Sequence, residues 1–208
     1  MKTTMKVLVM FTLVVAVFSQ SGNVSAADVY KFKGNSASAY FYNVDPSGCI
    51  ATGGTVFVFE NISHSPPGPG GYETDVLIDF FKQDICTGTI LMSASNRAPA
   101  EIIEFDVAGN LDSVTLVATV PMYDYLNNIA FDFMVDLTWT GTSSIGHQNS
   151  QYKVNFQGCH YNLKNNSAFR YAVASGSVSD GTTNFTPEPS AQGTNFLAKG
   201  GEISHGCN

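Results

Sequence analysis

The sequence predicts an all-β protein with antiparallel strands, preferably a two-sheet sandwich of jelly-roll type, with a closed barrel as the alternative. Three observations predict this fold class. Apolar and polar residues alternate with a period of two in many short segments, and Gly, Pro, Asn and Asp separate these segments. After its N-terminal segment, the chain has no stretch with the apolar spacing of an amphipathic helix.

The N-terminus has the three parts of a secretory signal peptide. Two lysines precede an apolar stretch from Val7 to Phe18, and small residues ending at Ala26 form the expected cleavage site. The apolar stretch has roughly a dozen residues, whereas a membrane-spanning helix needs about 20. We therefore expect a signal peptide over residues 1–26, one all-β domain over residues 27–208, and a secreted or extracytoplasmic product.

The first half of the mature chain contains six segments that alternate in this way. Each is short and ends near Gly, Asn, Asp or Pro, as strands of a β-sandwich do. In chain order, the predicted strands are Val29–Phe32, Ala37–Tyr42, Thr55–Glu60, Asp75–Lys82, Thr89–Ala94 and Glu101–Phe105.

The second half contains the clearest alternation in the chain. From Phe131 to Thr140 every second residue is large and apolar, and the segment from Asp112 to Val120 has the same period. The residues between them, Tyr123–Asn128, form a short connection, so we predict a β-hairpin. The remaining predicted strands bring the total to about eleven, and they are Tyr152–Gln157, Phe169–Ala174 and Asn195–Ile203.

Three segments are predicted to be long loops. Asn61–Tyr72 contains a run of Pro and Gly that cannot continue a strand, and Gly141–Ser150 and Ser175–Gln192 are rich in small polar residues. Long loops on a rigid sheet often carry binding residues. Each segment is therefore either a candidate binding loop or a solvated connection.

The mature chain has an even number of cysteines, at sequence separations of 37, 73 and 48. This spacing lacks the close pairs of a zinc or redox site, so two disulfide bonds are expected in an exported protein. Three connectivities are possible. We favour Cys49 with Cys86 and Cys159 with Cys207, because each pair then closes a loop within one half of the chain.

The charge of the mature chain limits its partners. Without the signal peptide, eight basic residues face seventeen acidic ones, a formal net charge of −9. Nucleic acids require a basic surface, and the basic residues here are scattered singly. We therefore expect no nucleic-acid partner and no membrane insertion. A carbohydrate or protein surface remains as the partner, and the oligomeric state is left open.

No set of residues has the spacing of a catalytic or metal site. Asp132 and Asp136 share one face of a predicted strand, but four residues separate them by roughly 13 Å, beyond the separation of glycosidase carboxylates. A cross-strand partner cannot be assigned without the register. We predict no catalytic residue, no metal ligand and no cofactor, although oxygen ligands in residues 106–112 leave a structural calcium ion open.

Among the residue types, the aromatic residues give the clearest indication of a function. Tyr40, Phe41 and Tyr42 are consecutive, so both faces of that predicted strand carry rings. Tyr residues also occur in predicted connections, where exposed rings can stack on sugars or anchor protein partners. The candidate binding residues are Tyr72, Tyr123 and Tyr125.

These observations favour a secreted, non-catalytic extracellular binding module that recognises a polysaccharide or protein surface through loops and exposed Tyr. One alternative is a self-assembling surface or filament subunit, in which the segment from Asp28 to Lys33 pairs with a neighbour's sheet edge. Another is a secreted hydrolase with an unrecognised carboxylate site. A binding assay, the oligomeric state and an activity panel distinguish these three classes.

Overall fold

A computed structural model describes residues 29–63, 71–156, 159–188 and 196–205. All regular secondary structure in these ranges is β, which confirms the predicted fold class. The strands are β1 (Val29–Val44), β2 (Ile50–Ser63), β3 (Gly71–Asp84), β4 (Thr89–Asn96), β5 (Glu101–Val107), β6 (Ser113–Asp124), β7 (Ile129–Gly141), β8 (Gly146–Phe156), β9 (Cys159–Ser179), β10 (Asn184–Phe185) and β11 (Phe196–His205).

All described strand pairings are antiparallel and belong to one sheet. The sheet follows the order β10-β9-β11-β1-β2-β3-β4-β6-β5, while β7 pairs with β6 and β9, and β8 pairs with β9. The hydrogen-bonded path therefore returns to β9. It closes through a short ladder in which Ala94–Asn96 face Met122–Asp124. Because this ladder is so short, the preference for a sandwich over a closed barrel stays a prediction.

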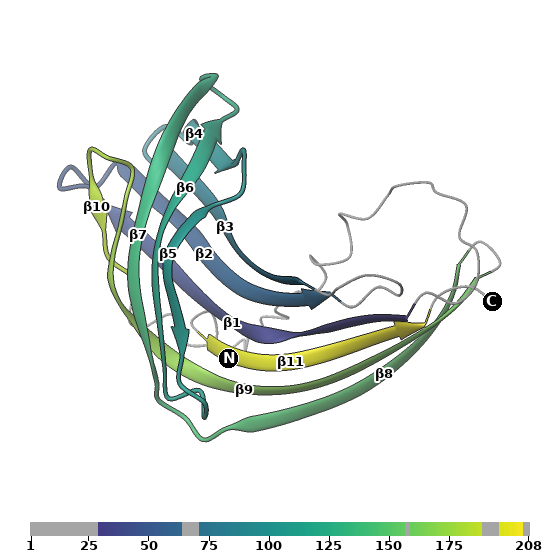
Figure 1. The fold of residues 1–208 in the computed structure, drawn as a ribbon. Helices are drawn as coiled ribbons and strands as arrows, with labels where there is room; N and C mark the ends of the chain where they lie inside the picture. The colour runs from purple at the N-terminus through teal and green to yellow at the C-terminus, as the bar shows by residue number, and fades with distance from the viewer. Residues whose placement is uncertain (1–28, 64–70, 157–158, 189–195, 206–208) are drawn as a thin grey trace, which may run out of the picture.

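The core lies between two parts of this curved sheet. In Figure 1, β5, β6 and β7 lie in front of β1, β2 and β3, and the outer parts of β1, β8, β9 and β11 extend beyond them as a long curved surface. The predicted alternation is confirmed on β7, where the four alternate residues Phe133, Val135, Leu137 and Trp139 are buried. Trp139 Nε1 donates a hydrogen bond to the Ser38 carbonyl oxygen at 2.8 Å, which ties β7 to β1.

Four phenylalanine rings meet at one end of the core. Phe41, Phe80, Phe133 and Phe185 come from β1, β3, β7 and β10, and all six centroid distances among them lie between 5.1 and 6.5 Å. The ring of Phe185 explains why β10 forms within a segment that we predicted to be a loop. Burial of a large apolar side chain fixes the backbone on either side of it.

Two further predicted boundaries are wrong. Val29–Phe32 and Ala37–Tyr42 belong to one strand, β1, because Asn35 donates from its backbone and side-chain nitrogens to the Glu60 carboxylate of β2, at 3.2 and 2.6 Å. The predicted loop Gly141–Ser150 is also shorter, since β8 begins at Gly146 and pairs with β9. Pairing with neighbouring strands, which the local sequence does not reveal, extends both strands.

One predicted disulfide bond is confirmed. Cys49 and Cys86 are bonded, with their Cα atoms 5.1 Å apart, and the bond joins the β1–β2 turn to the β3–β4 turn. The second disulfide bond and the signal peptide stay predictions. Cys207, the side chain of Cys159 and residues 1–26 lie outside the described residues. A disulfide bond is compatible with an extracytoplasmic location. In the described ranges, no helix has the length and apolar character needed to cross a membrane.

Candidate functional site

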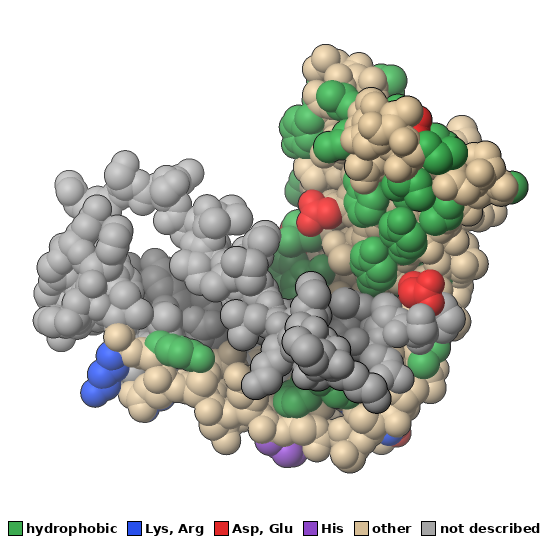
Figure 2. Space-filling model, turned by 180° about the vertical axis from the view of Figure 1, so that it is seen from behind, with side chains coloured by type: hydrophobic (Ala, Val, Ile, Leu, Met, Phe, Trp, Pro, Cys, Tyr) green, Lys and Arg blue, Asp and Glu red, His purple; other side chains and the backbone are tan. Residues whose placement is uncertain are grey.

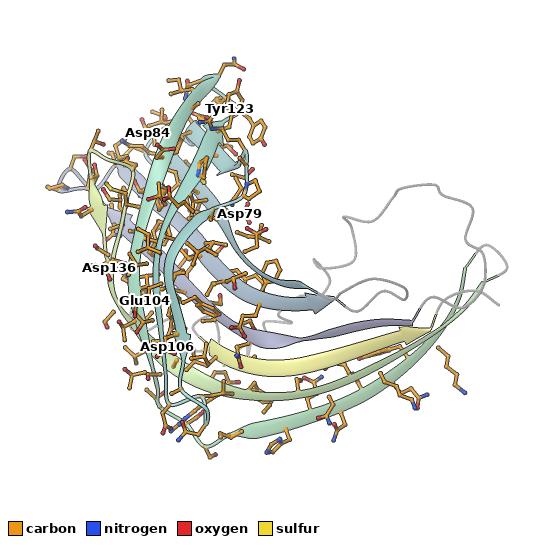
Figure 3. The ribbon with its side chains drawn as sticks, viewed as in Figure 1. Asp79, Asp84, Glu104, Asp106, Tyr123 and Asp136 are labelled. Atoms are coloured by element: carbon orange, nitrogen blue, oxygen red, sulfur yellow. A yellow bond between two sulfur atoms is a disulfide. The ribbon has the colours of Figure 1, made fainter. Side chains whose placement is uncertain are left out.

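Two of the three candidate tyrosines lie together at one end of the molecule. Tyr123 lies near the end of β6 and Tyr125 in the turn between β6 and β7, with ring centroids 5.2 Å apart and ring planes inclined by 77°. Tyr125 is 59% exposed, whereas Tyr123 is half-buried. Figure 3 shows Tyr123 at the upper end of the molecule. The backbone of Tyr72 belongs to β3, opposite Ile62, but its side chain lies outside the described residues.

A buried carboxylate holds the turn between these strands. Asp124 is 0% exposed and accepts hydrogen bonds from the backbone nitrogens of Ser93, Leu126 and Asn127, at 3.2, 2.9 and 3.4 Å. The side-chain nitrogen of Asn127 donates to its second oxygen at 2.5 Å. Burial acts to raise the pKa of Asp124, but these hydrogen bonds outweigh burial and lower the pKa below its usual value. The turn is thus a rigid platform for Tyr125.

Replacing Asp124 with Asn is expected to destabilise the protein by about 1–3 kcal/mol at pH 7, because its part-buried hydrogen-bond donors lose a charged acceptor. The lowered folded-state pKa adds stability above the unfolded value of about 4, and this stability is lost as the pH falls through the folded-state pKa. Urea unfolding at pH 7 and pH 3 should therefore show a smaller difference between the two proteins at pH 3. Asp132→Asn, at an exposed position on β7, is the control. An equal difference at both pH values contradicts the proposed role of the carboxylate.

Exposed apolar residues also lie in the two segments that meet at Tyr125. The side-chain nitrogen of Asn127 donates to the Leu91 carbonyl oxygen at 2.8 Å, and Tyr125 N donates to the Ser93 carbonyl oxygen at 2.9 Å, so the turn lies along the start of β4. We call the exposed apolar residues of these two segments the turn patch. They are Ile90, Leu91, Tyr125, Leu126 and Ile129.

The aliphatic members of the turn patch were not predicted from the sequence. Ile90 and Leu91 lie in a segment that alternation predicts to be a strand, where apolar residues are expected to be buried. Instead, β4 extends past the end of its ladder with β6, which begins at Ala94, and its first residues remain exposed. Exposed apolar side chains gathered on neighbouring segments are typical of an interaction site.

The carboxylates do not form a pair of the glycosidase type within the described ladders. None of the described pairings places two acidic residues directly opposite each other. Glu104 of β5 and Asp136 of β7 both lie opposite Val117 of β6, so one whole strand separates them. Figure 3 labels both side chains on the front part of the sheet, where β6 lies between β5 and β7. The register therefore offers no support for a hydrolytic site at Asp132 or Asp136.

The loop considered for calcium has another role. The Asp112 carboxylate accepts hydrogen bonds from Arg170 and from the side chain of Asn110, and Arg170 Nε also donates to the Ser143 carbonyl oxygen at 2.5 Å. These contacts connect the β5–β6 and β7–β8 connections to β9. In the part of the chain that the structure describes, no three His, Cys, Asp or Glu side chains are grouped to hold a metal ion.

Comparisons with known proteins give little guidance. No protein-family model matches the chain, and no curated protein matches it. One solved structure with some likeness is a protein of Nitrosomonas europaea provisionally named AttH. Its TM-score is 0.30 at 10% sequence identity, and the alignment covers 90% of this chain and 53% of that protein. The chain thus spans about half the length of that protein, and the likeness is too low to support an argument about fold or function.

Proposed function

We propose that the chain is an exported, non-catalytic binding module that recognises a protein or polysaccharide surface, and that the turn patch contacts this ligand. The observation that carries the proposal is the exposure of Tyr125, Leu126 and Ile129 on a turn that buried Asp124 holds in place. A rigid binding surface loses little conformational entropy when it binds. Aromatic rings with aliphatic neighbours are also typical of the centres of binding interfaces.

Self-assembly by strand addition has weaker support. The N-terminal residues Val29–Lys33 pair with β11 of the same chain, so this edge is already used. Among the described strands, β5 pairs with β6 alone, but its register shifts at a bulge, and Glu101, Glu104 and Asp106 are exposed along it. Bulges and charges on an edge strand oppose its pairing with another chain.

The proposal is tested with the mature, oxidised protein on arrays of polysaccharides and of extracellular proteins. We expect saturable binding to at least one immobilised surface and at least a tenfold loss of affinity in the double variant Tyr125→Ser/Leu126→Ser. Tyr152→Ser is the matched control, because Tyr152 is as exposed as Tyr125 but lies on β8. Binding to no surface on either array, or an equal loss in the control, contradicts the proposal.

A further inference from the structure

A second aromatic surface covers the outer face of β1, β2 and β3. Alternate residues of these strands, such as Phe41, Val56 and Ile78, are buried in the core. Successive side chains of a strand point to opposite faces, so the intervening residues lie on the outer face. Figure 2, a view from behind, shows hydrophobic side chains gathered on the upright part with acidic side chains beside them. We call the large members the sheet-face patch: Tyr40, Tyr42, Phe57, Phe59, Leu77 and Phe81.

The register brings two rings of this patch together over a glycine. Tyr42 of β1 and Phe81 of β3 both lie opposite Gly53 of β2. A Cβ atom on Gly53 would lie 2.7 Å from Phe81 Cζ and 3.1 Å from Tyr42 Cδ2. The absence of a side chain on Gly53 therefore allows both rings to lie low over the sheet.

The rest of the patch continues this low surface. The rings of Phe57 and Phe59 are stacked, with centroids 5.4 Å apart and planes inclined by 27°. Leu77, which lies opposite Phe57, is 46% exposed, and Tyr42 is 38% exposed. The other members are half-buried. The surface is thus shallow and apolar, without the projecting side chains that fill a partner's pocket.

Carboxylates lie beside the rings. Asp79 is exposed and lies opposite Thr55, which in turn lies opposite Tyr40. The backbone nitrogen of Glu188 donates to the Tyr40 carbonyl oxygen at 2.9 Å, so the Glu188 backbone lies beside β1 at Tyr40. Burial raises the pKa of Tyr40, and the neighbouring Tyr42 and the charge of Glu188 raise it further. Figure 3 shows Asp79 near the middle of the upright part.

We infer that the sheet-face patch binds a neutral polysaccharide by stacking its sugar rings on Tyr42 and Phe81. A sugar ring has an apolar face of C–H groups that packs on an aromatic face. Its hydroxyl groups donate to carboxylates such as Asp79 and Glu188, and such charge-assisted hydrogen bonds are strong. The same carboxylates repel acidic polysaccharides and a second copy of this acidic chain. This inference rests on the proposed binding function but assigns a second surface and a ligand class.

The test compares variants of the two patches on the same ligands. Affinity electrophoresis and calorimetry measure binding to neutral polysaccharides, such as cellulose oligomers and xylan, and to polygalacturonate as an acidic chain. We expect saturable binding to a neutral chain and a loss of about tenfold or more in Tyr42→Ala/Phe81→Ala. Gly53→Val should weaken binding as well, because it displaces both rings. Asp79→Asn leaves the rings in place and should weaken binding several-fold.

Each alternative outcome is informative. Tyr152→Ser, at an exposed position on β8 outside both patches, should leave binding to the neutral chain unchanged. If Asp79→Asn and both ring variants retain binding while Tyr125→Ser/Leu126→Ser loses it, the inference is wrong and the proposed binding function stands. Stronger binding to polygalacturonate, or binding only to a basic protein such as polylysine that 0.5 M salt abolishes, also overturns the inference. Far-UV circular dichroism establishes that each variant is folded.

Discussion

Trp139→Ala is expected to lower the free energy of unfolding by about 3–5 kcal/mol, the range for large aromatic residues in a core. Trp139 is 0% exposed, belongs to the hydrophobic core and lies between Val114 of β6 and Ala174 of β9. Its removal leaves a cavity and also leaves the Ser38 carbonyl oxygen without the donor that Nε1 supplies at 2.8 Å. Both effects act between β7 and β1, so the substitution weakens the packing and removes the hydrogen bond between these two facing parts of the sheet.

The measurement is guanidinium unfolding followed by far-UV circular dichroism, because Trp139 is the only tryptophan in the chain and its fluorescence is lost in the variant. Met134→Ala is the control, since Met134 lies on the same strand but is half exposed, and a change within about 0.5 kcal/mol is expected there. Trp139→Phe should lie between the two, because it keeps most of the apolar volume but not the hydrogen bond. A loss below about 1 kcal/mol for Trp139→Ala contradicts this account of the core.

The sequence was sufficient to predict the strands whose two faces differ. Along β6, the residues Val114, Leu116, Ala118 and Val120 are buried, and the residues between them are half-buried. A period of two identifies such a strand without any knowledge of its neighbours. The confirmed disulfide bond between Cys49 and Cys86 was predicted on a different ground, namely that it closes a loop within one half of the chain.

The continuous strand β1 was not predictable in this way. Lys33, Gly34 and Asn35 look like a break between two strands, because Gly and Asn usually end strands. The Asn35 side chain is instead bonded to Glu60 of β2, and a Cβ on Gly34 would lie 1.9 Å from the Glu60 carbonyl oxygen. Gly34 thus allows a close approach of two strands, which only the three-dimensional arrangement reveals.

More of the turn patch than of the sheet-face patch could be predicted from the sequence. Tyr123 and Tyr125 are neighbours in the chain, and their exposed connection could be predicted from the hairpin. Tyr123 itself proved to belong to β6, opposite Ala130. The meeting of Tyr42 with Phe81 depends on the register of three strands across Gly53, and sequence periodicity gives the face of a residue but not its partner on the next strand.

Removal of the disulfide bond with Cys49→Ser/Cys86→Ser is expected to cost about 2–4 kcal/mol. The bond closes a loop with a sequence separation of 37 that contains all of β2 and β3. In the folded protein the ends of this loop are also held by the β2–β3 ladder, which reaches Ile50 and Asp84, and by the hydrogen bond from Ile85 N to the Cys49 carbonyl oxygen at 2.7 Å. The folded structure should therefore persist without the bond, and the loss arises mainly from the greater freedom of the unfolded chain.

Urea unfolding of the double variant measures this loss, and non-reducing peptide mapping of the parent protein first verifies the bond. The variant should keep the far-UV spectrum of the parent and unfold at a lower urea concentration with a similar or larger dependence on urea, because its unfolded chain is less compact. Thr87→Ala is the matched control in the same turn, at an exposed position next to Cys86. If the double variant loses its β spectrum, the bond is required to hold the two turns in place, and the ladder alone is insufficient. An unchanged midpoint shows instead that the unfolded chain gains no freedom when the bond is removed, which contradicts the entropic account.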